Sequence, residues 1–150
     1  MAAVYKGQWD AEGCRRFLAE SVYPMRLACV ADDGFPRVVS LWYSLVGEQL
    51  LCVSHRSSQL IALLEGNERV GFEVAPNEPP YRGVRGQGTV RLASDADGEV
   101  LTHMLQRYLG RSDSKLGRWL LSRADGEMVI RIEPTRMFSW DYSERMDDLS

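Results

Sequence analysis

Residues 25–54 read MRLACVADDGFPRVVSLWYSLVGEQLLCVS, and in this stretch three apolar runs alternate with two short polar turns. The runs are rich in the β-branched and aromatic residues that favour strands, and they cover 25–31, 36–46 and 49–54. The first turn ends in Gly34, which is free to take a positive φ, and the second is Gly47-Glu48. Three strands joined by tight turns predict an antiparallel meander.

The segments on either side of the meander extend the same architecture. On the N-terminal side, Asp10 can cap a helix that Pro24 ends. On the C-terminal side, the pattern predicts these elements in order: a helix at 57–67, strands at 70–75 and 82–92, helical stretches at 100–108 and 114–122, and one long broken strand or two at 127–140, with Pro134 at the break. We therefore expect a mainly β (α+β) fold, a small antiparallel barrel of six or seven strands with a few helices packed outside.

The length and composition are those of an ordinary soluble protein, and we expect one domain over residues 1–150. Chains split into several domains only well beyond this length, and 45% hydrophobic with 26% charged residues is a typical globular composition. A net charge of −3 argues against a nucleic-acid-binding module, which carries a clustered positive excess. The tail at 143–150 is polar, and we expect it to be flexible.

Three features of the sequence indicate the cellular compartment in which the protein is expected. No apolar run approaches the ~18 residues that cross a bilayer, so no membrane contact is expected. The N-terminal stretch MAAVYKGQWDAEG lacks the apolar core of a signal peptide. Cys14, Cys29 and Cys52 are odd in number and far apart, so neither disulfides nor a zinc site is expected. Together these features predict a cytoplasmic protein.

The strand at 82–92 lies within EPPYRGVRGQGTVRL, residues 78–92, and is interrupted by Gly83, Gly86 and Gly88. Each glycine inside a strand costs roughly 0.5–1 kcal/mol relative to alanine, so three of them need a reason. Two interpretations remain open: the glycines let the barrel bend, or they leave space for a flat ligand against the backbone. The spacing is not the dinucleotide-binding fingerprint, which lies between a strand and a helix.

The segment CVSHRSSQL at 52–60 is a candidate anion site. A strand ends there, a polar loop follows, and a helix begins at a pair of serines. Helix N-termini present unpaired N–H groups and the positive end of the helix dipole, which suits a phosphate group. The polar side chains of the loop are Ser54, His55, Arg56, Ser57 and Ser58. An ordinary capping turn with a surface arginine would explain the same residues.

No catalytic motif accompanies this loop. The sequence contains no G-x-S-x-G nucleophile elbow, no H-E-x-x-H metal motif and no P-loop. His103 falls beside the apolar stripe of its helix, and no second histidine or carboxylate is placed to complete a metal site. We therefore expect no metal and assign no catalytic residue.

The order and spacing of these segments resemble those of the pyridoxamine 5′-phosphate oxidase-like family of FMN-binding split barrels. The shared signals are the strand–DG–strand opening, the serine loop before a helix, the N-x-x-V entry to a strand at 67–70, YR-x-V-x-x-x-G at 81–88 and SWDY at 139–142. The resemblance runs from about residue 15 to residue 142. It implies a split β-barrel and a homodimer that binds a flavin or deazaflavin coenzyme.

The resemblance also implies roles for particular residues. The flavin ring would lie along the strand at 38–42, and its phosphate would lie at the loop and helix start, 54–59. The partner subunit would contribute Arg82 and Gln87, and Trp140 would close the pocket from the same side. The implied cofactor-binding residues are Arg37, Val38, Val39, Ser40, Leu41, Trp42, Ser54, His55, Arg56, Ser57, Ser58, Gln59, Arg82, Gln87 and Trp140.

Two stretches depart from the family pattern. Relatives that hold the phosphate strongly carry Ser-Arg-Lys in the loop, whereas here Gln59 and Leu60 follow the serine. Arg56 or Arg37 must then supply the positive charge for a charge-assisted contact. The final residues, SERMDDLS, lack the basic substrate segment of true pyridoxamine 5′-phosphate oxidases, so that particular reaction is not expected.

The resemblance therefore implies a cytoplasmic, homodimeric oxidoreductase that uses FMN and acts on a small-molecule substrate. A coenzyme that carries the hydride leaves the protein the task of positioning, which agrees with the absence of a catalytic motif. Three alternatives remain open: a reductase dependent on the deazaflavin coenzyme, a non-catalytic flavin- or haem-binding protein of the same fold, and a structural dimer with a vestigial site.

Overall fold

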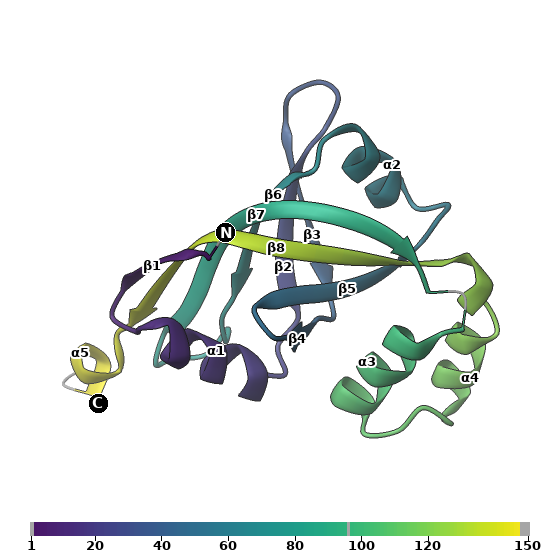
Figure 1. Ribbon diagram of the computed structural model, residues 1–150. Helices are drawn as coiled ribbons and strands as arrows, with labels where there is room; N and C mark the ends of the chain where they lie inside the picture. The colour runs from purple at the N-terminus through teal and green to yellow at the C-terminus, as the bar shows by residue number, and fades with distance from the viewer. Residues whose placement is uncertain (1, 96, 148–150) are drawn as a thin grey trace.

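The computed structural model describes residues 2–95 and 97–147, and Figure 1 shows their arrangement. The strands in these residues are β1 (Val4–Gly7), β2 (Met25–Val30), β3 (Pro36–Leu41), β4 (Ser44–Val46), β5 (Gln49–His55), β6 (Arg69–Val74), β7 (Arg82–Ser94) and β8 (Glu127–Asp141). The helices are α1 (Ala11–Glu20), α2 (Gln59–Gly66), α3 (Glu99–Leu109), α4 (Lys115–Leu121) and α5 (Ser143–Asp147), with a 3₁₀ turn, η1, at Ala124–Gly126.

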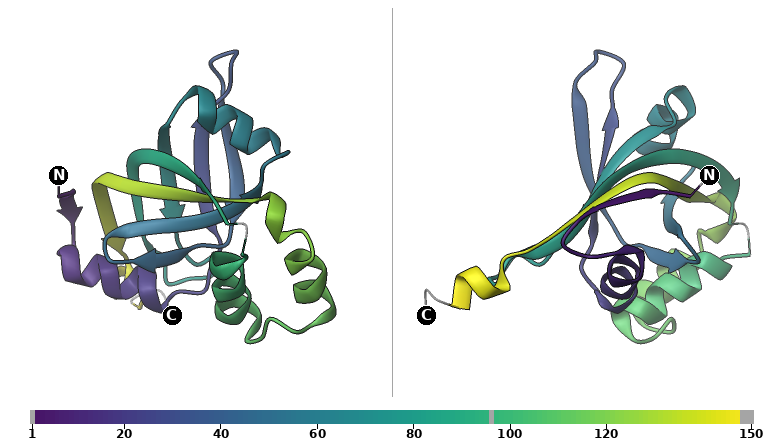
Figure 2. Two further views of the ribbon diagram at one scale, coloured as in Figure 1. Left: turned by 45° about the vertical axis from the view of Figure 1, so that its right-hand side comes forward. Right: turned by 60° about the vertical axis from the view of Figure 1, so that its left-hand side comes forward.

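The strands form one curved sheet in the order β3-β2-β6-β7-β8-β5-β4, with β1 beside β8. Neighbouring strands pair antiparallel, except that β1 runs parallel to β8. The long strands β7 and β8 bend strongly across the molecule, and the helices lie outside the sheet (Figures 1 and 2). Helices α3 and α4 lie together at one end, next to β5, while α2 lies beside the projecting β2–β3 hairpin. The predicted split barrel with peripheral helices is confirmed.

The described residues contain eight strands rather than the six or seven expected. Strand β1 is not among the predicted elements, because its short sequence, VYKG, has no strand pattern and it forms by pairing with β8. The single strand predicted at 36–46 is divided into β3 and β4, because the chain leaves the ladder at Trp42 and Tyr43.

The break predicted at Pro134 is a bulge within one continuous strand, β8. Gln87 pairs with Arg136 and Gly88 with Pro134, so Thr135 is the extra residue. Proline has no N–H group to donate to the ladder, and a bulge is one of the few positions inside a sheet that accept it. Bulges also increase local bend and twist, so this position contributes to the curvature of β8.

The three glycines of β7 lie where neighbouring strands approach closely. A Cβ atom on Gly83 would lie 2.7 Å from a carbonyl oxygen of β6, and one on Gly86 would lie 2.5 Å from a carbonyl oxygen of β8. A Cβ atom on Gly88 would overlap the carbonyl oxygen of Glu133, next to the bulge. Of the two interpretations of these glycines, the bent sheet therefore accounts for all three.

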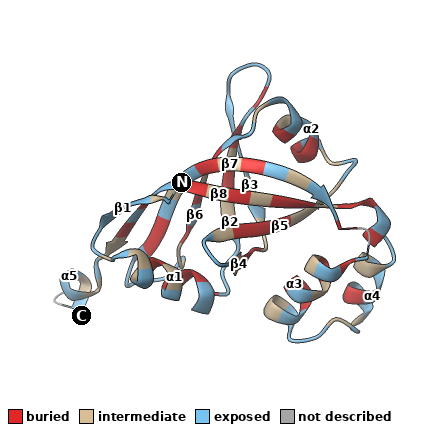
Figure 3. Ribbon diagram, viewed as in Figure 1, coloured by how far each residue is buried: buried red, intermediate tan, exposed pale blue. Residues whose placement is uncertain are grey.

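The main core lies between the curved sheet and the helices that cover it. Buried residues follow β5, β7 and β8 and the inner faces of α1 and α2 (Figure 3). Helix capping follows the predicted pattern: the Asp10 carboxylate accepts the Gly13 N–H at 2.8 Å, and Ser58 Oγ accepts the Ile61 N–H at 3.2 Å. All three cysteines are buried and unpaired: Cys14 in α1, Cys29 in β2 and Cys52 in β5.

An arginine ties α3 to the end of α1. Arg107 on α3 donates to the carbonyl oxygens of Leu18 at 3.0 Å and Ala19 at 2.9 Å, and also to that of Ser21. Its guanidinium lies 5.0 Å from the centroid of the Tyr43 ring. A cation at a helix C-terminus satisfies the last carbonyls and favours the dipole, so this contact fixes α3 against the barrel.

The polar tail, predicted to be flexible, begins with a short helix. Helix α5 follows Tyr142, whose N–H donates to the carbonyl oxygen of Tyr81 at 2.9 Å. The rest of the tail, 148–150, lies outside the described residues. Among the helices that the structure describes, none is long and apolar enough to cross a membrane.

Candidate functional site

A pocket of about 370 Å³ opens beside the C-terminal end of β3, and we call it the β3 pocket. Its volume lies within the range of about 300–1,000 Å³ that ligand pockets usually have. It brings together β3, the end of β5, the helices α3 and α4, and the start of β8. The residues that line it are Ser40, Leu41, Trp42, Val53, Ser54, His55, Leu101, Met104, Leu120, Arg123 and Glu127.

Strand β3 borders this pocket as an edge strand. Within the described residues β3 pairs only with β2, so its other edge offers unpaired backbone N–H and C=O groups. Arg37, Val38 and Ser40 are exposed, and Val38 is 64% accessible despite its apolar side chain. An exposed strand edge with an apolar side chain suits a flat, hydrogen-bonding ligand, because main-chain groups can bind its polar rim.

The loop between β5 and α2 is held in one conformation by its own side chains. Ser54 Oγ donates to Ser58 Oγ at 2.9 Å, and Ser58 Oγ caps α2. His55 Nδ1 lies 2.7 Å from Ser57 Oγ and accepts the Ser57 backbone N–H at 3.2 Å. The loop therefore combines the capping function and the group of hydroxyls that the sequence suggests.

The two candidate cations of the loop lie in different places. The Arg37 guanidinium donates to Gln59 Oε1 at 2.9 Å, which holds it at the first residue of α2. The Arg56 guanidinium instead donates to the carbonyl oxygen of Asp125 at 2.9 Å, in the turn η1. Of the two arginines, Arg37 is therefore the one held at the helix N-terminus. Gln59, which departs from the family pattern, is the residue that holds it there.

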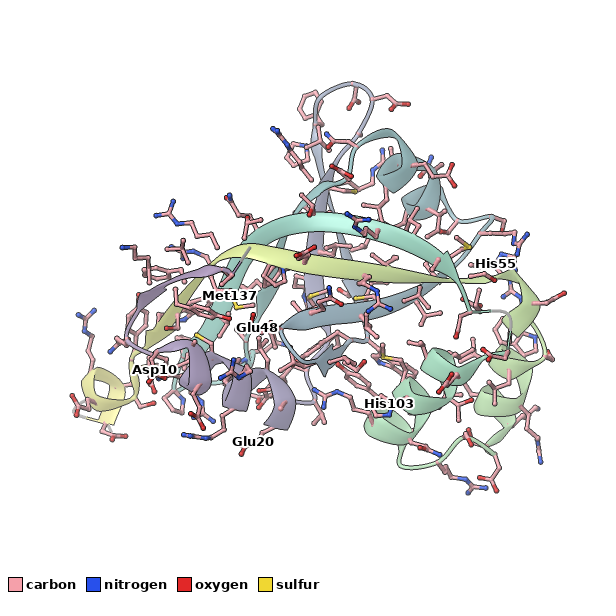
Figure 4. The ribbon with its side chains drawn as sticks, viewed as in Figure 1. Asp10, Glu20, Glu48, His55, His103 and Met137 are labelled. Carbon is pink, nitrogen blue, oxygen red and sulfur yellow. The ribbon has the colours of Figure 1, made fainter. Side chains whose placement is uncertain are left out.

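The opposite side of the β3 pocket carries Glu127 and Arg123, which the sequence did not indicate, beside His55, which it did. His55 and Glu127 are directly opposite each other on the paired strands β5 and β8. Figure 4 shows His55 at the end of β5, beside the turn that leads into β8. Gly126 makes room for it, because a Cβ atom there would overlap the imidazole ring. Arg123 lines the pocket next to these residues.

Burial governs the electrostatics of this group. Glu127 is 7% exposed, and its removal from water raises the pKa of its carboxyl group above the usual value. Electrostatic interactions with His55 and Arg123 act in the opposite direction, and the negative charge of Asp95 adds to the rise. Glu127 is thus a carboxyl group whose protonated form is favoured by its surroundings.

Helices α3 and α4 supply the apolar wall of the pocket. Leu101 and Met104 come from α3, and Leu120 comes from α4. The Trp42 ring stacks on that of Tyr108, with centroids 5.1 Å apart and planes within 6°. The sequence predicts both helices, but their place over the end of β5 depends on tertiary contacts that no local pattern carries.

Five of the fifteen predicted cofactor residues line the β3 pocket: Ser40, Leu41, Trp42, Ser54 and His55. Seven others belong to the adjoining strand, loop and helix start without lining the pocket: Arg37, Val38, Val39, Arg56, Ser57, Ser58 and Gln59. The remaining three lie elsewhere on the same chain. Arg82 is exposed and lies over the Phe17 ring, 5.8 Å from its centroid, in a separate pocket beside α1. Gln87 lies on the outer face of β7. Trp140 packs beside β7, where the Arg85 guanidinium lies 5.7 Å from its ring. In a single chain these residues do not meet the others.

The chain has one other histidine, His103. His103 is exposed on α3 and does not line the β3 pocket (Figure 4). Within residues 2–95 and 97–147, no group of three or more His, Cys, Asp or Glu side chains is arranged to hold a metal ion.

Comparison with known proteins points to one family. A family model described as pyridoxamine 5′-phosphate oxidase matches residues 11–141. No curated protein matches the sequence significantly.

Solved structures share the fold over most of the chain. A conserved hypothetical protein of Mycobacterium tuberculosis, Rv2991, has a TM-score of 0.77 and 21% identity, covering 93% of this chain and 89% of that one. An F420 reductase has a TM-score of 0.70 and 25% identity, covering 80% and 92%. The heme storage protein HutZ of Vibrio cholerae has a TM-score of 0.64 and 18% identity, covering 85% and 92%.

Proposed function

The chain belongs to the pyridoxamine 5′-phosphate oxidase family, and from this premise we propose that it is a cytoplasmic oxidoreductase that binds FMN in the β3 pocket. The observation that carries the proposal is that the C-terminal end of β3 lines this pocket, while Arg37 on the same strand is held by Gln59 at the N-terminus of α2. A bound flavin supplies two-electron hydride transfer, and the protein supplies binding, orientation and electrostatics.

The residues around the pocket fit the parts of such a coenzyme. The edge of β3 from Val38 to Leu41 offers backbone groups and apolar surface to the planar ring, and Trp42 follows directly. Arg37 and the N-terminus of α2 offer a cation and a helix dipole to the phosphate, while the Ser57 hydroxyl is held by His55 Nδ1. Ser58 is committed to capping α2, so its hydroxyl contributes through the loop rather than through a free donor.

A deazaflavin-dependent reductase is the second candidate. It is supported by the F420 reductase, which has 25% identity with this chain over 80% of its length. The same strand edge and helix N-terminus would bind a deazaflavin ring and its phosphate. The two coenzymes differ mainly in the length of the anionic tail, so direct binding measurements can separate them.

Homodimer formation would bring the separated residues to the site. Val30, Phe35 and Val38 on the projecting β2–β3 hairpin are large apolar residues left exposed, with Phe35 72% accessible. A second copy that covers this hairpin would bury them. We propose that the same contact brings Arg82, Gln87 and Trp140 of one subunit to the β3 pocket of the other.

Arg82→Ala is expected to weaken coenzyme binding about 3- to 10-fold, because a partly exposed arginine contributes about 1 kcal/mol to an ionic contact. The free energy of unfolding should change by less than about 0.5 kcal/mol, since Arg82 is exposed. Arg91→Ala, another exposed arginine of β7, is the matched control and should leave affinity unchanged. Equal losses in both variants would show a general charge effect and remove Arg82 from the site.

The proposed function is tested by titrating the coenzyme-free protein separately with FMN and with F420, following coenzyme fluorescence. Saturable binding of FMN at micromolar or lower concentration is the expected result. Tighter binding of F420 would favour the deazaflavin-dependent reductase. If neither compound binds, the proposed function is wrong, and binding of haemin alone would point to the haem-binding alternative.

Turnover separates an enzyme from a coenzyme store. The protein loaded with FMN should oxidise a reduced nicotinamide in the presence of a quinone such as menadione. The protein loaded with reduced F420 should oxidise that coenzyme directly with the quinone. Coenzyme binding with no turnover above the rate of the free coenzyme would contradict the enzyme and favour a binding protein.

A further inference from the structure

The β3 pocket contains a carboxyl group that coenzyme binding does not require. Of the residues that line this pocket in the described chain, Glu127 alone carries a carboxyl group. It is the first residue of β8, and pairing with β5 fixes its backbone opposite that of His55. The carboxyl group therefore stands on a rigid strand rather than on a mobile loop, as a group that acts on a reacting atom needs to.

The surroundings of Glu127 suit a group that gains and loses a proton. Three ionisable residues act on it: His55 at the end of β5, Arg123 just before η1 and Asp95 directly after β7. Asp95 is committed to another task, because its two carboxylate oxygens accept the N–H groups of Val100 and Leu101 at the start of α3. Burial favours the protonated form of Glu127, while His55 and Arg123 stabilise its carboxylate once it forms.

We propose that Glu127 is a catalytic residue, the proton donor that accompanies hydride transfer to a substrate bound in the β3 pocket. The inference rests on the proposed function and names the substrate class that an apolar wall and a buried carboxyl group suit: a mainly apolar compound with a carbonyl oxygen. Its apolar part would contact Leu101, Met104 and Leu120, and its carbonyl oxygen would lie at the charged side of the pocket.

The atoms and electrons of the step balance. A bound reduced coenzyme would supply the substrate with a hydride, which carries two electrons, and negative charge would develop on the carbonyl oxygen. The O–H bond of Glu127 breaks and its proton bonds to that oxygen, so the substrate gains two hydrogens and Glu127 becomes a carboxylate. Water returns a proton to Glu127, which restores its protonated form.

The direction of the pH dependence follows from this assignment. Glu127 acts in its protonated form, so the rate of the hydride step should fall as pH rises through the elevated pKa of its carboxyl group. An apolar substrate removes more water from the pocket, which moves that pKa further upward. A Glu127 that only supported the fold would affect stability and leave the pH profile of the step unchanged.

The test uses the protein loaded with reduced coenzyme, mixed with menadione or with cyclohexenone, and follows coenzyme oxidation in a single turnover between about pH 5 and pH 9. Glu127→Gln should lower the rate at the acidic end of this range about 100-fold or more, because general acids typically contribute 10²–10⁴-fold. It should also abolish the pH dependence, and Glu127→Asp should restore part of both. Coenzyme affinity should stay within about twofold of the original.

Glu133→Gln is the matched control, because Glu133 lies on the same strand and does not line the β3 pocket. A second readout needs neither coenzyme nor turnover. Carbon-13 NMR of the side-chain carboxyl groups should show one glutamate titrating above the ordinary value of about 4.3, and Glu127→Gln should remove that signal.

Each outcome bears on a different claim. Unchanged rates and pH profile in Glu127→Gln, with coenzyme still bound, would overturn the role of Glu127 alone. An NMR titration in which the Glu127 signal shows no elevated pKa would do the same. Transfer to neither acceptor would overturn the substrate class and the proposal with it. Failure of the original protein to bind any coenzyme would overturn the proposed function, and this inference would fall with it.

Discussion

Replacing Gly88 with alanine is expected to lower the free energy of unfolding by about 2–4 kcal/mol, because the added methyl group meets backbone that cannot move aside. The new Cβ would overlap the carbonyl oxygen of Glu133 and lie 3.0 Å from the Cα atom of Pro134. These atoms lie at and next to the bulge in β8, where Thr89 pairs with Glu133 and Gly88 with Pro134. To relieve the overlap, the ladder between the two longest strands would have to open locally.

Gly71→Ala is the matched control for this prediction. Gly71 lies on the neighbouring strand β6, and its added Cβ would have no contact closer than 3.7 Å. Alanine in a strand is favoured over glycine by roughly 0.5–1 kcal/mol, so Gly71→Ala should be neutral or slightly stabilising. Urea unfolding followed by far-ultraviolet circular dichroism measures both changes. Equal stability of the two variants would contradict the close approach at Gly88.

The second large effect is expected at Arg37. Arg37→Ala should weaken binding of FMN or F420 about 10- to 100-fold, because a hydrogen bond to a charged group contributes roughly 1.5–3 kcal/mol. Gln59 holds the Arg37 guanidinium at the N-terminus of α2, so one substitution removes the nearest cation from the phosphate position. Gln59→Ala should give a smaller loss of the same kind, since the guanidinium remains but is no longer oriented.

Arg56→Ala is the comparison that makes the Arg37 prediction specific. Arg56 precedes the same helix by only a few residues, but its guanidinium donates to the carbonyl oxygen of Asp125. Its removal should leave coenzyme affinity within about twofold, because exposed charges that make no direct contact are largely screened. Fluorescence titration at two salt concentrations measures both variants. A larger loss for Arg56→Ala than for Arg37→Ala would place the phosphate at η1 instead.

Much of the fold is predictable because its strands and helices follow short-range patterns. The meander at 25–54, the Asp10 cap and the long strand at 127–140 are all visible in the spacing of apolar, polar and turn residues. The predictions that were wrong or missing concern features that form by pairing with strands far away in the sequence. Strand β1 exists only because β8 accepts it, and whether Pro134 ends a strand or forms a bulge depends on the register of β7. No local pattern carries that information.

The candidate site likewise contains residues that the sequence predicts and residues that it does not. The strand at 37–42 and the loop at 54–59 are adjacent in the structure, as the family resemblance implies, and Ser40 and Ser54 line one pocket. Glu127 escapes sequence reasoning because it is a single carboxylate at the start of a strand, with no motif around it. Its surroundings come from β5, β7 and the turn after α4, and only the folded chain brings these together.

Because all three cysteines are buried, the reactivity of their thiols reports local unfolding of the structure around them. Burial raises the pKa of each thiol, so the reactive thiolate is suppressed as long as the surrounding structure stays closed. Cys14, Cys29 and Cys52 sit in α1, β2 and β5, three elements that need not open together. The protein can be exposed to short pulses of a thiol-alkylating reagent. The order in which the three cysteines become labelled would show which of these elements opens first.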